Sequence, residues 1–186
     1  MKNKNQNSVS LSVKTRMEKY LLGRNDNTPV DVLYELCEDV DPFIRSSVAY
    51  NKNAPKELVS KLMFDTDDEI RAIISKRSDI SKEDILQMAF DPSSAVRHGL
   101  ARNRNTPVEF LKAMYNCQAL RVSVAGNTSC PTCILEELSK DKDEFVRGYV
   151  ASNASTPKTV LSNLEFDDIW WVRELAVANH KLPFKG

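Results

Sequence analysis

The sequence predicts an all-α solenoid, a stack of about seven two-helix repeats of 24–26 residues with no sheet. Three observations predict it. An arginine recurs at steps of 26, 26, 24, 26 and 26 residues, an asparagine follows it by six residues in most repeats, and a proline follows by four more. Agreement of several columns at fixed spacing indicates a repeat architecture. The arginine column consists of Arg45, Arg71, Arg97, Arg121, Arg147 and Arg173.

The first helix of each repeat is predicted to start at the proline. The fixed φ of proline and its missing N–H suit the first turn of a helix. Apolar residues follow the proline by three, four and seven positions, as Leu58, Val59 and Leu62 follow Pro55. This spacing places them on one face of a short helix.

The second helix is predicted to start after an acidic turn. Asp39 and Asp41 are one example, and the second aspartate of such a pair is a natural N-cap. Apolar residues then recur four positions apart, as at Ile44 and Val48, beside a column of mostly small residues such as Ala49. Because each helix has only about two turns, some of these turns are expected to be 3₁₀.

A single repeat of this kind cannot bury its own apolar face, whereas stacked repeats can. The segment "VRGYVASNASTPKTVLSNLEFDD" from Val146 resembles the leucine-rich repeat variant family, a relative in architecture of HEAT and armadillo repeats. The resemblance covers roughly Lys19 to Pro183, and it implies alternating α- and 3₁₀-helices wound into a right-handed superhelix. The family name carries no activity, and this chain lacks the Cys-rich iron–sulfur segment of some relatives.

Two repeats depart from the pattern. Arg77 and Ser81 stand where the third repeat should have its asparagine and its proline. The repeat between Arg97 and Arg121 is two residues short, and Cys117 replaces its first aspartate. We expect irregular stacking at both places.

Composition narrows the functional classes. Lys plus Arg and Asp plus Glu both number 26, so no net field attracts nucleic acid or anionic lipid. No apolar run approaches the roughly 18 residues of a membrane span, so we expect no membrane partner. Residues 1–10 are predicted to be a flexible polar tail without a signal-peptide core, and 11–186 a single repeat domain. These features predict a cytoplasmic protein with reduced thiols.

The arginine ladder has two interpretations. Six arginines along a solenoid can line a groove for phosphates. Alternatively, Asp41 lies four residues before Arg45, the spacing at which helical side chains meet, and Asp67 and Asp143 precede their arginines in the same way. The balanced net charge favours the second interpretation, a structural ladder of repeated ion pairs.

The asparagine column is predicted to close the turn after each second helix. Asparagine tolerates left-handed backbone, and its side chain bonds to nearby backbone groups.

The "CPTC" motif at Cys130 and Cys133 has the spacing of a redox or metal half-site. A redox pair normally accompanies a βαβ pattern, and a closed zinc site needs four ligands, neither of which is visible. Cys133 would lie in the first turn of a helix, where a thiol pKa can fall. We interpret the pair as two small thiols at a helix start, expect no cofactor, and interpret His98 and His180 as surface residues.

Binding in a solenoid depends on the columns that vary between repeats. On the second helices they predict a basic and aromatic strip on one face, suited to an acidic peptide or to a nucleic-acid backbone with stacked bases. The alternative is an ordinary solvated face. The strip consists of Tyr50, Lys76, His98, Arg102, Arg104 and Tyr149.

Trp170 and Trp171 differ in their columns. Trp171 shares the column of Phe43 and Phe145 and is predicted to be packed. Trp170 falls in a column that should face water, which makes it a candidate contact residue. Alternatively it covers the C-terminal end of the stack together with Leu182 and Phe184, and a weakly covered end would permit a homodimer.

The sequence therefore predicts a non-enzymatic scaffold whose variable face binds another protein. A nucleic-acid-binding solenoid of HEAT-like architecture is the alternative, by analogy of architecture only. A thiol or metal protein acting through Cys130 and Cys133 is the lesser alternative.

Overall fold

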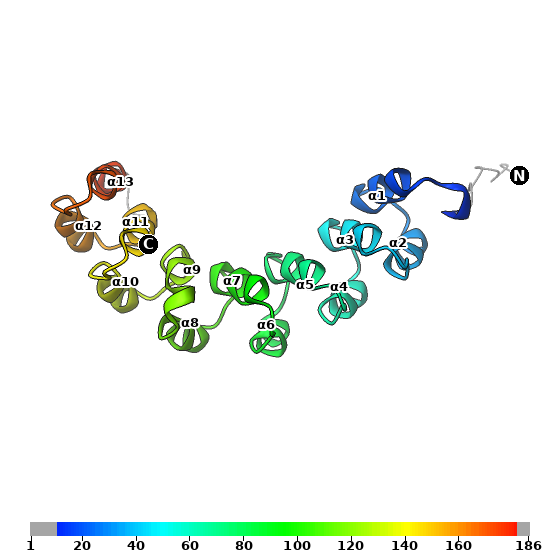
Figure 1. Cartoon of the computed structure of the whole chain (residues 1–186), viewed down its shortest axis with the longest axis horizontal. Coiled ribbons are helices and arrows are strands. Elements are labelled where there is room, and N and C mark those ends of the chain that lie inside the picture. Colours follow the sequence, from blue (N-terminus) through cyan, green and yellow to red (C-terminus); the bar gives the residue numbers. More distant parts are fainter. Residues whose placement is uncertain (1–10, 182–186) are drawn as a thin grey trace, which may run out of the picture. The chain divides into compact units, whose positions relative to one another are not determined.

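The computed structural model describes residues 11–181. This part of the chain has thirteen α-helices, two short 3₁₀ segments and no strand. It divides into two compact units between Ile74 and Ser75, and in each unit the helices stack in two layers (Figure 1). The predicted all-α repeat solenoid without a sheet is confirmed for the described residues. The single domain and the handedness of the superhelix stay predictions, and the predicted tail lies outside the described residues.

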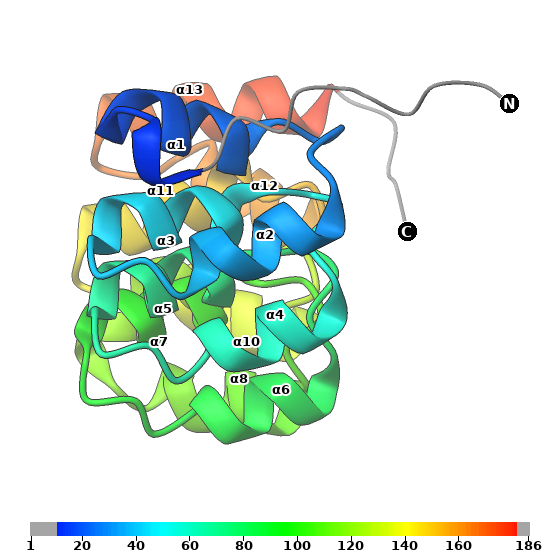
Figure 2. The same ribbon diagram turned by 90° about the vertical axis from the view of Figure 1, so that its right-hand side faces the viewer.

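The first unit contains a 3₁₀ turn and five helices. Helices α1 and α3 pack together in one layer, and α2 packs against both α3 and α4 (Figure 2). The elements are η1 (Leu11–Val13), α1 (Arg16–Arg24), α2 (Val30–Cys37), α3 (Pro42–Tyr50), α4 (Lys56–Leu62) and α5 (Asp68–Ser75).

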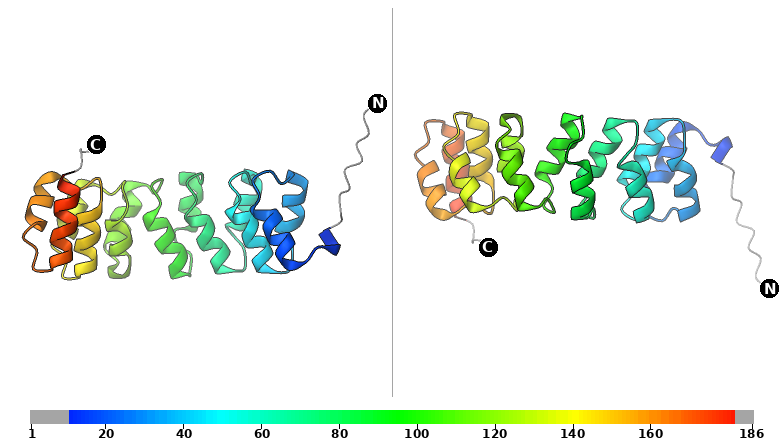
Figure 3. Two further views of the ribbon diagram at one scale, coloured as in Figure 1. Left: turned by 90° about the horizontal axis from the view of Figure 1, so that it is seen from above. Right: turned by 90° about the horizontal axis from the view of Figure 1, so that it is seen from below.

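The second unit repeats the same two-layer plan. Helices α7, α9, α11 and α13 form one layer, and α6, α8, α10 and α12 form the other (Figure 1). Figure 3 shows α13 (red) and α11 (yellow) lying side by side with nearly parallel axes. The elements are α6 (Lys82–Met88), α7 (Ser94–Arg102), α8 (Val108–Tyr115), η2 (Gln118–Leu120), α9 (Arg121–Ala125), α10 (Thr132–Leu138), α11 (Glu144–Ser152), α12 (Lys158–Leu164) and α13 (Trp170–His180).

The prolines that begin the first helices of the repeats are N-cap residues, one position before the helices they start. Pro55 has φ −55° and ψ 148°, and its carbonyl accepts the first helical bond from Val59 N at 3.1 Å. The ψ angle of an N-cap is extended, and proline reaches it without losing a donor that the helix needs. Ser81, which replaces the proline in the third repeat, forms a capping box with Asp84 instead.

Aspartates cap α3 and α11 as predicted, whereas Ser93 before α7 and Ile169 before α13 make no side-chain cap bond. Asp41 Oδ1 accepts from Phe43 N at 3.0 Å, and Asp143 Oδ1 accepts from Phe145 N at 2.9 Å. Both helices are α-helices, so the alternation of α and 3₁₀ that the family resemblance implies does not hold here. In the described residues, 3₁₀ structure is confined to η1 and η2. The segment η2 follows Cys117, where the missing aspartate and the shorter repeat leave the helix without a side-chain cap.

The core lies between the two layers of each unit. Leu33, Leu36 and Val48 are fully buried in the first unit, as are Leu111 and Leu135 in the second. The apolar faces of the first and second helices of the repeats meet in this core. Burial of each such side chain contributes about 1.5–3 kcal/mol to the stability of the fold. The small-residue column is buried except at its last position, Val177, which is exposed, and its small side chains allow neighbouring helices to approach closely.

The asparagine column links consecutive repeats. Asn153 Nδ2 donates to the carbonyls of Ala125 at 2.7 Å and Asn127 at 2.9 Å, both in the preceding repeat. Its Oδ1 accepts from Ser155 N at 2.9 Å, which closes the turn as predicted. The left-handed backbone that asparagine tolerates is not used, because Asn153 has φ −74° and no residue of the described chain has a positive φ. The side chain provides the turn's hydrogen bonds, so an extended backbone suffices.

The division between the units falls where irregular stacking was expected. It precedes Arg77, which stands in the asparagine column, by two residues. The Arg77 guanidinium binds Asp79 of its own turn, with Nη2 at 2.6 Å from Oδ2.

Candidate functional site

The arginine ladder joins each acidic turn to the next repeat. Arg45 Nη1 donates to the carbonyls of Asp39 at 3.0 Å and Val40 at 3.2 Å, and Arg45 Nη2 lies 2.8 Å from Asp65 Oδ1. Arg147 repeats this arrangement with Asp167, twenty residues ahead, and Arg121 does so with Asp141. Guanidinium groups held in this way have few donors left for phosphates, which supports the structural interpretation of the ladder.

The carboxylate partner differs from the predicted one. We expected Arg45 to pair with Asp41, four residues earlier, but the carboxylate it binds is Asp65 of the following repeat. Asp41 is engaged as the N-cap of α3 and with Arg16 of α1. The extended arginine side chain therefore spans two repeats rather than one helical turn.

The other three arginines of the ladder also bond to the acidic turns that precede them. Arg71, Arg97 and Arg173 donate Nη1 to two carbonyls of their own acidic turns. Cys117 occupies the position of the carboxylate that Arg97 would otherwise meet.

The predicted strip is divided between the two units. Tyr50 lies in the first unit, exposed on α3, with the Arg24 guanidinium 4.4 Å from its ring centroid. Lys76, Arg102 and Arg104 lie in the second unit and are exposed. His98 is half-buried, and its Nδ1 lies 2.8 Å from the hydroxyl of Ser123 on α9.

His180, at the end of α13, is also more engaged than a surface residue. Its Nδ1 lies 2.5 Å from Glu165 Oε1, just after α12, and it is half-buried. This pair links the last two helices of the described chain.

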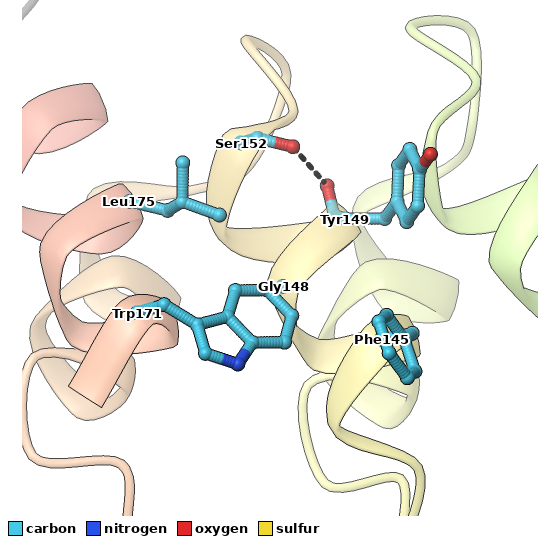
Figure 4. A pocket seen from close by; sticks show the side chains of 6 residues that line it. All are labelled: Phe145, Gly148, Tyr149, Ser152, Trp171 and Leu175. Atoms are coloured by element: carbon cyan, nitrogen blue, oxygen red, sulfur yellow. Dashed lines mark hydrogen bonds between the residues drawn. The ribbon is translucent and has the colours of Figure 1, made fainter. Parts of the chain in front are cut away.

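An apolar pocket lies between α11 and α13 (Figure 4). Its volume is about 310 Å³, near the lower end of the roughly 300–1,000 Å³ typical of ligand pockets. Phe145 and Tyr149 form the side near α11, while Trp171 and Leu175 project from α13. The only side-chain oxygens of the lining belong to Tyr149 and Ser152, and the Ser152 hydroxyl donates to the Tyr149 carbonyl at 3.1 Å. The pocket therefore offers mainly carbon surface.

Gly148 completes the lining and determines where the indole lies. A Cβ on Gly148 would lie 2.0 Å from Trp171 Cζ3, far closer than atoms can approach. The absence of a side chain lets the indole lie directly on the backbone of α11. Trp171 also contacts Phe145, with ring centroids 5.7 Å apart, and is thus packed as its column predicted.

Arg102 borders the pocket through Tyr149. Its guanidinium carbon lies 5.0 Å from the Tyr149 ring centroid, within the range of a cation–π contact. The same ring lies close to Gly126 at the end of α9, where a Cβ would be 3.1 Å from Tyr149 Cδ1. Within residues 11–181 the Arg102 guanidinium has no carboxylate partner, unlike Arg45 and Arg147.

Trp170 is not part of the lining of this pocket and lines a second surface hollow. It is 62% exposed, and its neighbours there include Glu165, Arg173 and Glu174. The predicted covering by Leu182 and Phe184 lies outside the described residues, and the predicted homodimer stays a prediction.

The cysteines are free thiols in different environments. Cys130 is buried just before α10. This burial raises the pKa of its thiol to about 12, and the nearby Cys133 contributes in the same direction. Cys133 in the first turn of α10 and Cys117 are exposed. In residues 11–181 no cluster of three or more His, Cys, Asp or Glu side chains is arranged to hold a metal ion. Burial thus makes Cys130 a poor nucleophile at neutral pH.

Sequence reasoning named Tyr149 but missed the pocket as a unit. It placed Trp171 in a packed column but did not connect that residue with Gly148. A usable signal was present, since a glycine in a mid-helix position, 23 residues before a tryptophan, leaves room for its ring.

Within the described residues, no helix combines the length and the apolar character that crossing a membrane requires.

No protein-family model matches the chain. No curated protein matches it either. Among solved structures, the chain is similar to one described as a leucine-rich repeat variant with a novel repetitive protein structural motif. The two are 26% identical, the match covers 82% of this chain and 72% of that one, and the TM-score is 0.39. The chain is thus similar to a leucine-rich repeat variant in this comparison, as its repeat pattern predicted.

Proposed function

We propose that this chain is a non-enzymatic repeat scaffold that binds another protein through its variable face, with the pocket between α11 and α13 at the centre of the contact. One observation carries the proposal. Aromatic side chains surround an open hollow at the surface. The exposed fraction of Phe145 is 59% and that of Tyr149 is 37%. Clusters of exposed aromatic residues beside an arginine are typical of the residues that dominate protein interfaces.

The regular framework supports this assignment of roles. The arginine, asparagine and aspartate columns are engaged in contacts within and between repeats. Repetition serves stability there, whereas the pocket occurs where the variable columns depart from the pattern. A partner would therefore be recognised by the variable side chains and held on a rigid base.

Catalysis has little support in this geometry. The hydrogen bond between His98 and Ser123 resembles part of a catalytic pair. Ser123, however, is only 3% exposed, so its hydroxyl cannot meet a substrate. Nucleophilic catalysis needs a nucleophile that the substrate can reach.

The test is a pull-down from native cell extract with the full chain as bait, with and without nuclease and at two salt concentrations. The pocket variant is Leu175→Asp, and its matched control is Leu86→Asp, since Leu86 is an exposed leucine on α6. We expect a protein partner that survives nuclease and is lost with Leu175→Asp but kept with Leu86→Asp. A partner retained equally by both variants, or no partner at all, would refute the proposal.

Nucleic-acid binding is the alternative function, resting on exposed Lys76, Arg102 and Arg104. Loss of the retained partner after nuclease treatment in the pull-down would favour nucleic-acid binding. Its affinity should then fall steeply with salt, because phosphate contacts release counterions.

A further inference from the structure

We infer that the pocket between α11 and α13 takes one large apolar side chain of a partner segment that carries a carboxylate nearby in its sequence. This inference rests on the proposed protein-binding function and specifies the chemistry of the partner. It follows from three features: the carbon-lined walls, their exposure, and the arginine beside them, Arg102, which has no carboxylate partner within residues 11–181.

The walls favour an apolar side chain. The hollow is surrounded by the ring carbons of Phe145, Tyr149 and Trp171 and by the side chain of Leu175. The Ser152 hydroxyl already donates its hydrogen bond to the Tyr149 carbonyl. An aromatic or leucine side chain placed there removes apolar surface on both partners from water. A polar side chain would lose water contacts and find few hydrogen-bond partners in return.

The exposure of the walls favours a chain segment over a small molecule. Small-molecule sites enclose most of the ligand surface. Here Phe145 and Tyr149 remain open to solvent, so an occupant keeps one side free. A side chain that enters from a peptide backbone lying across the opening has this geometry.

Arg102 supplies the charge preference. It has no carboxylate partner in the described part of the chain, and it lies over the Tyr149 ring at the pocket edge. Helices α7 and α9 contain no aspartate or glutamate, so no acid on either helix competes for it. The acidic residues of α11 and α13 are Glu144 and Glu174, and Glu174 lines the other hollow with Trp170.

The distances set how far apart the two groups of the partner should be. The Arg102 guanidinium carbon is 5.0 Å from the centroid of a ring that lines the pocket. An extended chain advances about 3.3–3.6 Å per residue. A carboxylate one to three residues from the apolar anchor therefore reaches Arg102, in a position where a charge-assisted hydrogen bond can form.

The experiment uses the full chain with Trp170→Phe, which leaves Trp171 as the only tryptophan and as the reporter of the pocket. The probes are short glycine–serine peptides with a central phenylalanine flanked by aspartates. Matched peptides carry lysine for each aspartate, or alanine for the phenylalanine. Binding is followed by Trp171 fluorescence and by the polarisation of a dye on the peptide.

We expect the aspartate–phenylalanine peptide to change the Trp171 emission and to bind at least about tenfold more tightly than either matched peptide. Arg102→Glu should abolish the preference for aspartate over lysine. Arg104→Glu is the charge-matched control, since Arg104 is also exposed but, unlike Arg102, makes no cation–π contact with the Tyr149 ring, and it should leave most of the preference intact.

Equal binding of the aspartate and lysine peptides, an unchanged Trp171 signal, or equal effects of the two arginine variants would each overturn the inference. A pocket-dependent partner in the pull-down combined with any of these results would leave the proposed function standing and reject only the partner chemistry. If no pocket-dependent partner is found, the proposed function itself fails.

Discussion

The same six repeat positions are filled differently at α1–α3 and at α11–α13. The pocket residues Phe145, Gly148, Tyr149, Ser152, Trp171 and Leu175 correspond, 128 positions earlier, to Met17, Tyr20, Leu21, Arg24, Phe43 and Ser47. In the first unit, Tyr20 stacks on Phe43 with ring centroids 4.1 Å apart, and Arg16 lies 4.3 Å from the Phe43 centroid. In the second unit, glycine replaces that tyrosine, and the indole lies on the helix backbone.

The comparison teaches that one framework can present either a filled or a hollow surface. Both regions use a link from a basic side chain to the aspartate twenty residues ahead, Lys19–Asp39 in the first and Arg147–Asp167 in the second. Among the six differences, the one at Tyr20 and Gly148 bears most directly on the surface, because the aromatic ring that stacks on Phe43 in the first region has no counterpart beside Trp171. The framework therefore tolerates changes at the columns that decide what the surface can bind.

The largest expected effect concerns the framework common to both regions. Asn153→Ala removes two hydrogen bonds to buried carbonyls of the preceding repeat, so we expect the free energy of unfolding to fall by about 3 kcal/mol. Urea unfolding followed by circular dichroism measures it. Asn163→Ala, at an exposed position of α12, is the control and should change little. Similar losses for both variants would show that the asparagine column does not join the repeats.

The next prediction tries to convert the first region into the second. Tyr20→Gly removes the stacked ring, worth about 0.5–1.5 kcal/mol beyond its burial, and adds a helix cost of about 1 kcal/mol. We expect the free energy of unfolding to fall by about 2 kcal/mol in the same assay. Tyr34→Ala, an exposed tyrosine on α2, serves as the control. An unchanged stability would mean that the stack contributes nothing to the first unit.

The reverse change tests the hollow region. Gly148→Ala places a Cβ against the rigid Trp171 ring, and we expect it to be about 1.5 kcal/mol less stable than Gly126→Ala. At Gly126 the contact of 3.1 Å involves the half-exposed Tyr149 ring, which can move by a few tenths of an ångström. Trp171 emission should shift only for the first variant. Equal stabilities would contradict the role of Gly148 in seating the indole.

The smallest effect concerns pH. A hydrogen bond from Arg147 lowers the pKa of Asp167 below its ordinary value. Because the folded pKa is depressed, this stabilisation is complete above the unfolded pKa of about 3.9 and is lost as the pH falls through the folded value. We expect Asp167→Asn to cost about 1 kcal/mol at pH 7 and progressively less below about pH 4.

The exposed neighbour provides the control for that measurement. Asp168→Asn should have little effect at either pH, since its side chain is exposed. Urea unfolding at neutral and acidic pH gives both differences, and a cost that does not shrink in acid would contradict the assignment to the Arg147–Asp167 pair.

Much of the fold could be predicted because its signals are local and repeated. The proline column, the aspartate caps such as Asp41 and the apolar stripes each specify a short helix within a few residues. Their repetition at about 26 residues then implies stacking. The errors were also local in origin. Asp41 looked like the partner of Arg45 because helical spacing was the only geometry available, and a partner 20 residues ahead needs the stack itself.

The candidate site was less predictable. Tyr149 was named as a member of the variable strip and Trp170 as a candidate contact residue in a column that faces water, and the structure places them in different hollows. The contact between Gly148 and Trp171 depends on how closely α11 and α13 approach, which no single repeat encodes.

The sequence by itself determined that this protein is a stack of two-helix repeats, because capping and apolar periodicity act over a few residues and recur along the chain. Only the tertiary structure decided which carboxylate each arginine pairs with and to which carbonyls each asparagine side chain donates. It alone showed a hollow beside Arg102, because that hollow depends on side chains from neighbouring repeats meeting across helices.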